Sequence, residues 1–389
     1  MIFLGVVFLS VSILRAQEFF TIEGHVPSLP DSTVLFLYLQ DEQDVRLSQV
    51  VDTAYVLHGR FVFRYPIEKE ARFDLDGQPE IVGPTFLQIW ARPGITLRMT
   101  GKEKWIDAWV IESPVPEQQE SERYRRAIVD LQDKYRQARI EKDSLREESG
   151  RTFPKDKEEI DKEMRRKQEV QDSLNYLMAE KTLSEVSRSE LSEVAVEQLS
   201  KISRMIFHYK GYAGLRERAV EQYERLSPGQ QLSDQGREIA LGLFPPDRVK
   251  IGDEMVEDSL PDLSGRLHSL TDYKGKYILL DFWASWCEPC LASVPELKEV
   301  AEIYRDRLTL IGISLDKNRE DWLQATRKHG VSWVNLNAPD QSEIAAKYGI
   351  NGIPHQVLIS PEGMVLGAWS GYSRGSIETQ LKKYIPSAE

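Results

Sequence analysis

The chain is poor in the residues that metal and thiol chemistry need: its 389 residues include only two cysteines and six histidines. Two cysteines exclude a disulfide-rich scaffold, which replaces a small core with several bridges. The histidines are scattered, and His25 and His58 stand alone, so neither is favoured as a metal ligand. A structural zinc site needs four ligands, and a single cysteine pair supplies two. We therefore expect no metal site.

The sequence also lacks a hydrophobic run long enough to span a membrane. Its only membrane-like stretch is residues 2–14, which is shorter than the ~20 residues of a spanning helix. Arg15-Ala16-Gln17 follows, and the small Ala16 suits cleavage by a signal peptidase. We predict a signal peptide over residues 1–16 and export to the periplasm or cell envelope. An uncleaved anchor or a buried strand is the alternative for this stretch.

Positive charge is in deficit as well, because the formal net charge is -12 at pH 7. This balance argues against binding to nucleic acid or to an anionic membrane surface. Hydrophobic residues make up 41% of the chain and charged residues 29%, as in a globular protein with some strongly charged helix. The length favours two or three domains.

The first part of the chain has the pattern of short β-strands. Apolar residues alternate or cluster over residues 33–39, 60–65 and 86–90, and turn residues such as Pro93-Gly94 separate the runs. Evenly spaced short strands with turn signals predict an all-β sandwich over residues 17–113.

The middle of the chain has the pattern of charged helices. Residues 118–149 are dense in Glu, Lys and Arg and carry a narrow apolar stripe at three-and-four spacing. A second charged segment covers residues 155–180. We predict an α-helical region over residues 114–245, in which these two helices form a solvated spacer, an antiparallel pair or an oligomer contact. Phe244-Pro245-Pro246 reads as a linker, because two prolines end a helix and stiffen the chain.

Strands and helices alternate over residues 246–389. Apolar strands are expected at 277–283 and 308–314, and a strand hairpin at 356–360 and 365–369. Helices are expected at residues 288–304, 319–329 and 376–384, with the first interrupted near Pro295. The order β-α-β-α followed by β-β-α predicts an α/β thioredoxin-like domain. The fold class is therefore multidomain: an all-β sandwich, a helical segment and a thioredoxin-like domain.

Both cysteines lie in one motif, Ser285-Trp286-Cys287-Glu288-Pro289-Cys290. A thiolate attacks a disulfide, and a helix N-terminus favours its negative charge, so Cys287 is the predicted attacking sulfur. Cys290, one turn further on, is the predicted resolving sulfur. Pro289 suits the first turn of a helix, where no N–H is needed. Glu288 places a carboxylate beside the sulfurs and opposes thiolate formation, which favours a reducing pair over a strongly oxidising one.

Two further features accompany the pair. Asp281 lies in the apolar strand six residues before Cys287, where burial should raise its pKa and allow it to accept the proton of Cys290. An aspartate turned to solvent is the alternative. The Ile353-Pro354 bond precedes another apolar strand, and an X-Pro bond in a tight turn can adopt the cis form. A cis turn there would bring the Ile353 backbone beside the sulfurs to pair with an incoming polypeptide.

The motifs of residues 249–389 resemble the TlpA/ResA-type thioredoxin-like disulfide reductases. The resemblance is carried by Asp281-Phe-Trp-Ala-Ser-Trp-Cys-Glu-Pro-Cys290, Lys274-Gly275-Lys276 and Gly352-Ile353-Pro354. It implies Cys287 as nucleophile, Cys290 as resolver and Pro354 as a cis proline. Ser293 departs from the pattern, because the subfamily often has Glu at this position.

The chain is therefore expected to be a thiol–disulfide oxidoreductase that reduces protein disulfides of the cell envelope. No cofactor is expected, and its partners would be disulfide-bonded proteins and an envelope electron donor. A peroxiredoxin is one alternative, but it needs Thr and Pro where Ala284 and Leu280 stand. A binding or scaffold protein whose N-terminal region carries the main role is the other.

Overall fold

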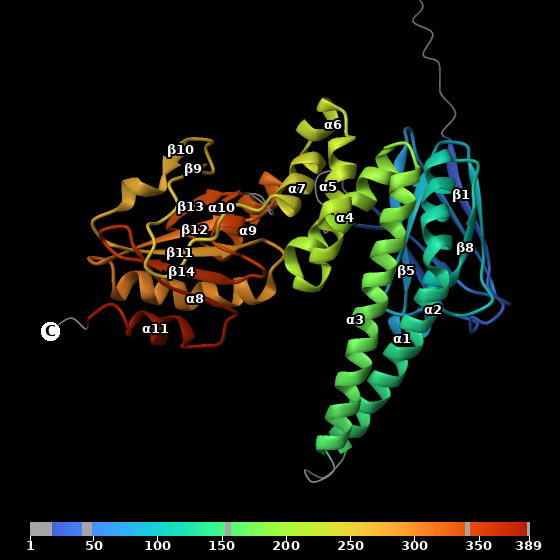
Figure 1. Cartoon of the computed structure of the whole chain (residues 1–389), viewed down its shortest axis with the longest axis horizontal. Helices are drawn as coiled ribbons and strands as arrows, with labels where there is room; N and C mark the ends of the chain where they lie inside the picture. The colour runs from blue at the N-terminus through green and yellow to red at the C-terminus, as the bar shows by residue number, and fades with distance from the viewer. Residues whose placement is uncertain (1–17, 41–48, 152–156, 339–342, 387–389) are drawn as a thin grey trace, which may run out of the picture. The chain divides into compact units, whose positions relative to one another are not determined.

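The computed structural model describes residues 18–40, 49–151, 157–338 and 343–386 (Figure 1). The predicted signal peptide at residues 1–16 lies outside these ranges. The chain divides into two compact units, residues 1–133 and 134–389. No helix in the described ranges is both long enough and apolar enough to cross a membrane.

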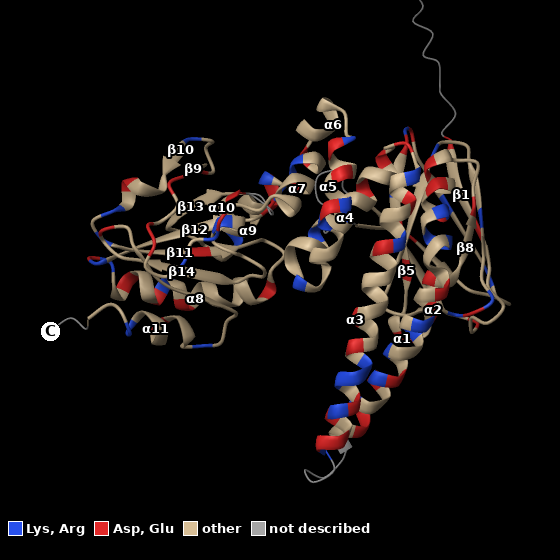
Figure 2. Cartoon of the chain, viewed as in Figure 1, with Lys and Arg blue, Asp and Glu red and all other residues tan. Residues whose placement is uncertain are grey.

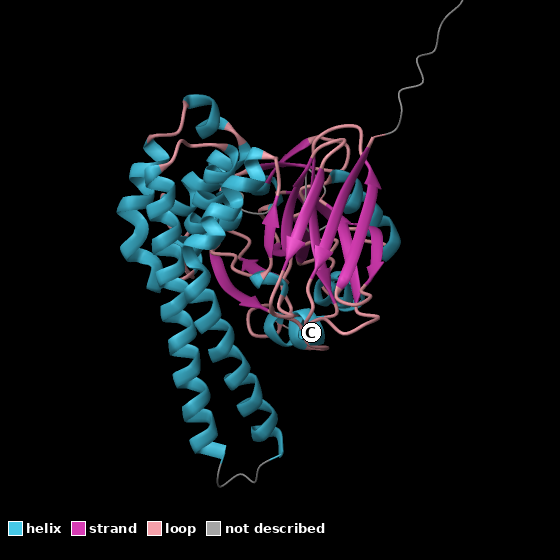
Figure 3. Ribbon diagram, turned by 90° about the vertical axis from the view of Figure 1, so that its right-hand side faces the viewer, coloured by secondary structure: helices cyan, strands magenta, loops and turns pink. Residues whose placement is uncertain are grey.

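The N-terminal unit is β-rich, as the sequence predicted. One four-stranded sheet has the order β4-β1-β7-β8 and another the order β3-β2-β5-β6. Figure 3 shows the strands of this unit in magenta. The strands are β1 (Phe19–His25), β2 (Val34–Leu39), β3 (Gln49–Tyr55), β4 (Arg60–Pro66), β5 (Ala71–Gly77), β6 (Leu87–Ala91), β7 (Thr96–Thr100) and β8 (Val110–Glu112). Short helices α1 (Pro79–Val82) and η2 (Ile106–Ala108) join them.

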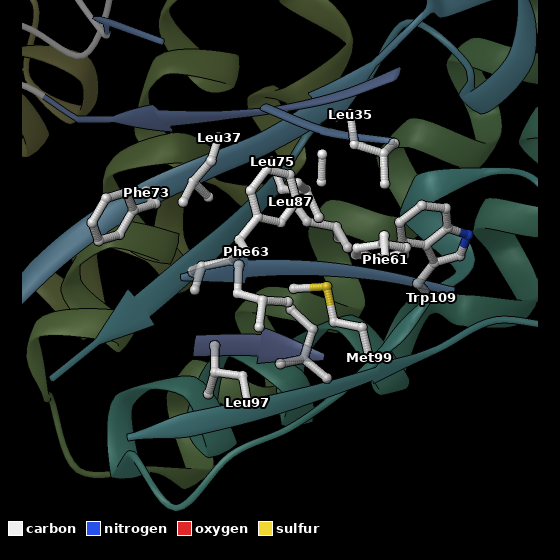
Figure 4. Packing of buried hydrophobic residues seen from close by; sticks show 14 of the residues in the cluster. Leu35, Leu37, Phe61, Phe63, Phe73, Leu75, Leu87, Leu97, Met99 and Trp109 are labelled. Atoms are coloured by element: carbon white, nitrogen blue, oxygen red, sulfur yellow. The ribbon is translucent and has the colours of Figure 1, made fainter. Parts of the chain in front are cut away.

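Alternating side chains from both sheets fill one core, because successive residues of a strand point to opposite faces (Figure 4). Phe61 and Phe63 of β4 are buried, whereas Val62 between them is 60% exposed. Gly24 of β1 lies directly opposite Phe61, and a Cβ atom at Gly24 would come within 2.0 Å of the Phe61 ring. Glycine is therefore required at this position of the core.

Two long charged helices follow, α2 (Pro116–Arg151) and α3 (Lys157–Arg188). Their charged side chains meet across the pair, since Lys167 lies 2.6 Å from Glu141 and Lys142 donates a hydrogen bond to Gln168. Figure 2 shows acidic and basic residues interspersed along both helices. Of the arrangements left open by the sequence, the structure shows α2 and α3 packed as a helix pair.

A small helical layer continues the second unit. It contains α4 (Glu193–His208), η3 (Lys210–Leu215), α5 (Arg216–Glu224), α6 (Pro228–Leu232) and α7 (Asp234–Leu243). Serine hydroxyls accept backbone hydrogen bonds at the starts of α4, α6 and α7, as expected of good N-caps. Gly242 lets α7 approach α4, because a Cβ atom there would lie 2.7 Å from the Ser203 carbonyl oxygen.

The last part of the chain is a five-stranded sheet of order β13-β12-β11-β14-β15. Its elements are β9 (Ser259–Pro261), β10 (Leu267–Ser269), η4 (Leu270–Tyr273), β11 (Tyr277–Trp283), α8 (Glu288–Ile303), β12 (Leu308–Ser314), α9 (Arg319–His329), β13 (Val334–Asn337), α10 (Glu343–Lys347), β14 (His355–Ile359), β15 (Val365–Ser370) and α11 (Ser376–Leu381). Strand β11 is central, parallel to β12 and antiparallel to β14. Separate apolar clusters cover its two faces, which explains its nearly continuous hydrophobic sequence.

One predicted detail of this sheet is wrong. Helix α8 runs without a break from Glu288 to Ile303 and contains Pro295. Val294, Leu297 and Val300 are all buried around the proline, so packing against the sheet offsets the hydrogen bond that proline removes.

Candidate active site

The cysteine pair lies at the junction between β11 and α8. Cys287 is the N-cap of α8 with an extended backbone, and its Sγ accepts a hydrogen bond from the Cys290 amide at 3.2 Å. The two sulfurs form a disulfide with the Cα atoms 5.2 Å apart. Cys287 is 4% exposed and Cys290 is 2% exposed, so both sulfurs are shielded.

The residues between the sulfurs face outward. Glu288 and Pro289 are exposed, and Pro289 occupies the first turn of α8 as the sequence predicted. Trp286, directly before the pair, is 37% exposed. The Glu288 carboxylate is therefore in solvent, where its effect on a Cys287 thiolate is screened.

A buried acid holds the turn that leads into the pair. Asp316, which is 2% exposed, accepts hydrogen bonds from the Ser285 amide at 3.0 and 3.1 Å and from the Ser285 hydroxyl at 2.6 Å. The Ser314 hydroxyl donates to the same carboxylate at 2.7 Å. Asp316 was not predicted from the sequence. The available signal was an acid two residues after the apolar strand β12, whose carboxyl end lies beside that of β11.

Asp281 lies in β11, and its side chain is buried, as predicted. Gln356 of β14 is directly opposite in the antiparallel register, and its Nε2 donates to the Asp281 Oδ1 at 2.7 Å. Burial raises the pKa of Asp281 to about 6, and the hydrogen bond from Gln356 partly opposes this shift. Gln356 was also missed, although a glutamine opening the apolar run 356–359 was a visible anomaly.

Asp281 shares a face of β11 with Trp283, because alternate residues of a strand point the same way. Trp283 belongs to a buried cluster with Cys287 and Cys290. The same face of β11 packs against α8 through Leu279 and Leu297. The predicted acid and the two sulfurs thus lie on one side of the sheet.

The Ile353-Pro354 peptide bond is cis, and the Pro354 carbonyl accepts a hydrogen bond from the Gly371 amide at 2.8 Å. The Ile353 side chain packs against the buried cysteine cluster. His355 follows, and burial lowers the pKa of its imidazole; its Nδ1 lies 2.7 Å from the Ser370 hydroxyl. The cis turn therefore borders the apolar cluster that contains both cysteines.

Ser293 lies three residues after Cys290 in α8. It is fully buried, and its hydroxyl donates to the Cys290 carbonyl at 2.7 Å. This side chain stabilises the first turn of α8 and supplies no second acid. Within the described ranges, no three His, Cys, Asp or Glu side chains are grouped to hold a metal ion.

Comparison with known proteins supports thiol–disulfide chemistry at this cysteine pair. Residues 275–365 match a family described as thioredoxin-like. Thiol-disulfide oxidoreductase ResA of Bacillus thuringiensis is 31% identical over 145 residues, which cover 36% of this chain and 82% of the relative. The ResA of Geobacillus thermodenitrificans is 29% identical over 140 residues, covering 36% of this chain and 80% of the relative.

The chain belongs to the thioredoxin-like thiol-disulfide oxidoreductases. Its activity is thiol–disulfide interchange, which involves protein substrates and redox partners. Among solved structures, the thioredoxin domain of a Bacteroides vulgatus thiol-disulfide oxidoreductase is 30% identical, with a TM-score of 0.32; 35% of this chain and 99% of that one are covered. A thiol-disulfide oxidoreductase from Bacteroides fragilis is 32% identical, with a TM-score of 0.32. The match covers 34% of this chain and 100% of that one.

Proposed function

We propose that this oxidoreductase reduces protein disulfides in the bacterial cell envelope through the dithiol of Cys287 and Cys290. The observation that carries the proposal is the position of Cys287 as the N-cap of α8, one helical turn before Cys290. The free amides and the dipole of the helix N-terminus stabilise a thiolate there. Cys287 is accordingly the attacking sulfur.

The proposed reaction transfers two electrons from the enzyme to the client. The Cys287 thiolate attacks one sulfur of the client disulfide, the client S–S bond breaks, and the released sulfur takes a proton. The Cys290 thiol then gives its proton to a base and attacks the Cys287 sulfur of the mixed disulfide. The second client sulfur leaves as a thiolate and is protonated. The enzyme is left as a disulfide, which a dithiol donor of the envelope reduces again.

Asp281 is the proposed base for the second step. With a pKa of about 6 it is mostly ionised at pH 7, so its carboxylate accepts a proton readily. Gln356 keeps the carboxylate oriented by donating to one of its oxygens. The solvent-screened Glu288 carboxylate opposes the Cys287 thiolate only weakly, and a reducing potential of the pair stays a prediction from the sequence.

The remaining predicted residues hold the client in place. Pro354 in its cis turn and Ile353 border the sulfurs, and the Ile353 backbone is the proposed pairing edge for an extended client segment. Trp286 and Pro289 shape the surface around Cys287.

The test is a Cys290→Ser variant. Without the resolving thiol, the mixed disulfide between Cys287 and the client cannot be released, so covalent adducts accumulate. The adducts are measured by non-reducing electrophoresis of cells in which thiols have been blocked, followed by mass spectrometry. We expect at least about tenfold more adduct than in wild type.

The control is the double variant Cys287→Ser, Cys290→Ser, which has no attacking sulfur and should form none. A Cys290→Ser chain free of adducts would count against the mechanism. Rapid peroxide consumption by the reduced wild type would instead support the peroxiredoxin alternative. If a Cys287→Ser chain keeps its cellular role, the N-terminal region carries that role.

We also propose the division predicted from the sequence: a signal peptide at residues 1–16, a β-sandwich at 17–113, a helical region at 114–245 and the thioredoxin-like domain at 246–389. Mass spectrometry of the chain isolated from the envelope would test cleavage after Ala16. Self-association through α2 and α3 remains a prediction, which sedimentation velocity would test.

A further inference from the structure

A cavity of about 310 Å³ lies beside the redox site within the unit of residues 134–389. Trp286, Gly352 and Ile353 form the wall nearest the cysteines. Helices α4 and α7 supply the opposite wall through Phe207 and Leu241. The volume is at the lower end of the ~300–1,000 Å³ range of ligand pockets, so it suits one large side chain better than a cofactor.

The segment after α7 ties the two walls together. The Arg248 guanidinium lies over the Phe207 ring of α4, 5.5 Å from its centre. One residue later, the Val249 amide donates to the Lys347 carbonyl of α10 at 2.9 Å. Helix α10 also lines the cavity, through Ala345 and Ala346. The same short stretch of chain therefore contacts both walls.

The lining is mainly apolar, and its formal charges are paired. Arg204 of α4 and Glu238 of α7 form an ion pair at 2.5 Å. A charged side chain entering the cavity would lose hydration and meet, among the described residues that line it, no unpaired Lys, Arg, Asp or Glu. An apolar side chain would instead bury its surface against Phe207, Leu241 and Trp286.

The cavity lies next to the place where a client disulfide reacts. Trp286 directly precedes Cys287, and Ile353 packs against the cluster that contains both cysteines. A client segment lying along the Ile353 edge would be extended and would advance ~3.3 Å per residue. A side chain within a few residues of the client cysteine then reaches the cavity.

We propose that α4 and α7 form a specificity wall for clients that carry a bulky apolar side chain, such as Leu or Phe, near the reacting cysteine. The inference rests on the proposed reduction of protein disulfides and adds the class of sequence that is preferred. It also gives the helical region a direct part in client selection.

The test uses the full chain and peptides with one intramolecular disulfide that differ only in a Leu, Gly or Glu beside a cysteine. We expect the wild type to reduce the Leu peptide with a kcat/KM at least about tenfold above that of the Gly peptide, with the Glu peptide lowest. Leu241→Glu places a carboxylate in the wall and should remove the preference for Leu by raising KM. Hydroxyethyl disulfide, which is too small to fill the cavity, should be reduced at an unchanged rate.

Leu232→Glu is the matched control, because Leu232 of α6 is 68% exposed and does not line the cavity. It should behave as wild type with every substrate. Phe207→Ala is a second variant that removes apolar surface without adding charge, and it should reduce the Leu preference in the same direction.

The inference is overturned if the wild type reduces the three peptides equally, or if Leu241→Glu and Phe207→Ala both keep the wild-type preference. Equal slowing of hydroxyethyl disulfide and of the peptides by these variants would also overturn it, since that pattern indicates general damage to the site. If the wild type reduces hydroxyethyl disulfide but none of the peptides, the proposed function fails as well.

Discussion

A carboxyl group buried in the central strand of a sheet destabilises the fold when it ionises. Asp281 has a pKa of about 6 in the folded chain, against 3.8 for an ordinary aspartate. Between these two values the folded state binds more protons than the unfolded state. The free energy of unfolding must therefore fall as the pH rises from about 4 to about 6, and the effect is constant above that range.

An Asp281→Asn variant should lose this dependence. Asparagine keeps an oxygen that accepts from Gln356 and carries no charge, so we expect the unfolding free energy of the variant to rise relative to that of wild type by about 2 kcal/mol between pH 4 and pH 7. Guanidinium unfolding of the oxidised proteins at a series of pH values measures the difference. Asp306→Asn, at a carboxylate that is 91% exposed, is the control and should change the stability by less than about 0.5 kcal/mol.

Gln356→Met serves as the companion variant. It removes the hydrogen bond that lowers the pKa of Asp281, so the decline in stability should extend to higher pH than in wild type. A flat difference between wild type and Asp281→Asn across this range would show that the Asp281 carboxyl is not buried as described.

At the scale of residues, the sequence identified the two sulfurs, the buried acid and the cis proline. It missed Gln356 and Asp316, because each acts through a partner on another strand. Gln356 meets Asp281 only through the register of β14, and Asp316 meets Ser285 only because β12 and β11 end together. Contacts of this kind depend on tertiary pairing, which local patterns do not determine.

Among the elements, α11 depends on a single side chain of α8. Glu296, which is 2% exposed, accepts hydrogen bonds from the amides of Gly375, Ile377 and Glu378 at 2.7, 2.9 and 3.1 Å. These amides lie at the start of α11 and have no partner within that helix. Glu296 therefore caps α11 from another element and anchors it to α8.

Glu296→Leu should destabilise the chain by about 2–4 kcal/mol, since it leaves buried amides without acceptors. Glu296→Gln keeps one acceptor oxygen and should cost less. Chemical denaturation followed by circular dichroism measures both. Glu299 lies in the same helix as Glu296 and makes an exposed contact with Arg374, so Glu299→Ala should change stability by less than about 0.5 kcal/mol. Equal effects of Glu296→Leu and Glu299→Ala would contradict the capping role.

The sequence predicted elements best where the apolar pattern is strong. Strand β12 and helix α9 have the predicted bounds of 308–314 and 319–329. The pairing of α2 with α3 was one of three options, because helices with thin apolar stripes leave their partners undetermined. Pro295 misled the prediction since its local cost is offset by long-range packing of α8.

At the scale of the molecule, the described residues form separate apolar cores. One core lies wholly within the β-rich unit, another within helices α3 to α7, and others cover the two faces of the thioredoxin-like sheet. Because the cores are separate, a substitution that destabilises one core need not unfold the domain around another. The alternating pattern predicted strands in the first unit, but not that β7 pairs with β1 in parallel, which depends on the whole sheet.

Phe63→Ala should lower the stability of the β-rich unit by about 3–5 kcal/mol, because it opens a cavity in a fully buried core. The rate of hydroxyethyl disulfide reduction should not change. Calorimetry combined with the rate assay measures both effects. Val62→Ala, on the opposite face of the same strand, should be nearly neutral. A loss of reduction activity in Phe63→Ala at a temperature where the redox domain stays folded would contradict this independence.

The central position of β11 determines when the two sulfurs become shielded as the chain is synthesised. Both strands that flank β11 come later in the chain, and Asp281 meets Gln356 across 75 residues of sequence. Such non-local pairing gives the domain a high contact order and slows its folding. A nascent chain therefore presents both thiols before the sheet beneath them is complete, and the shielding of the sulfurs is acquired only once β14 has been synthesised.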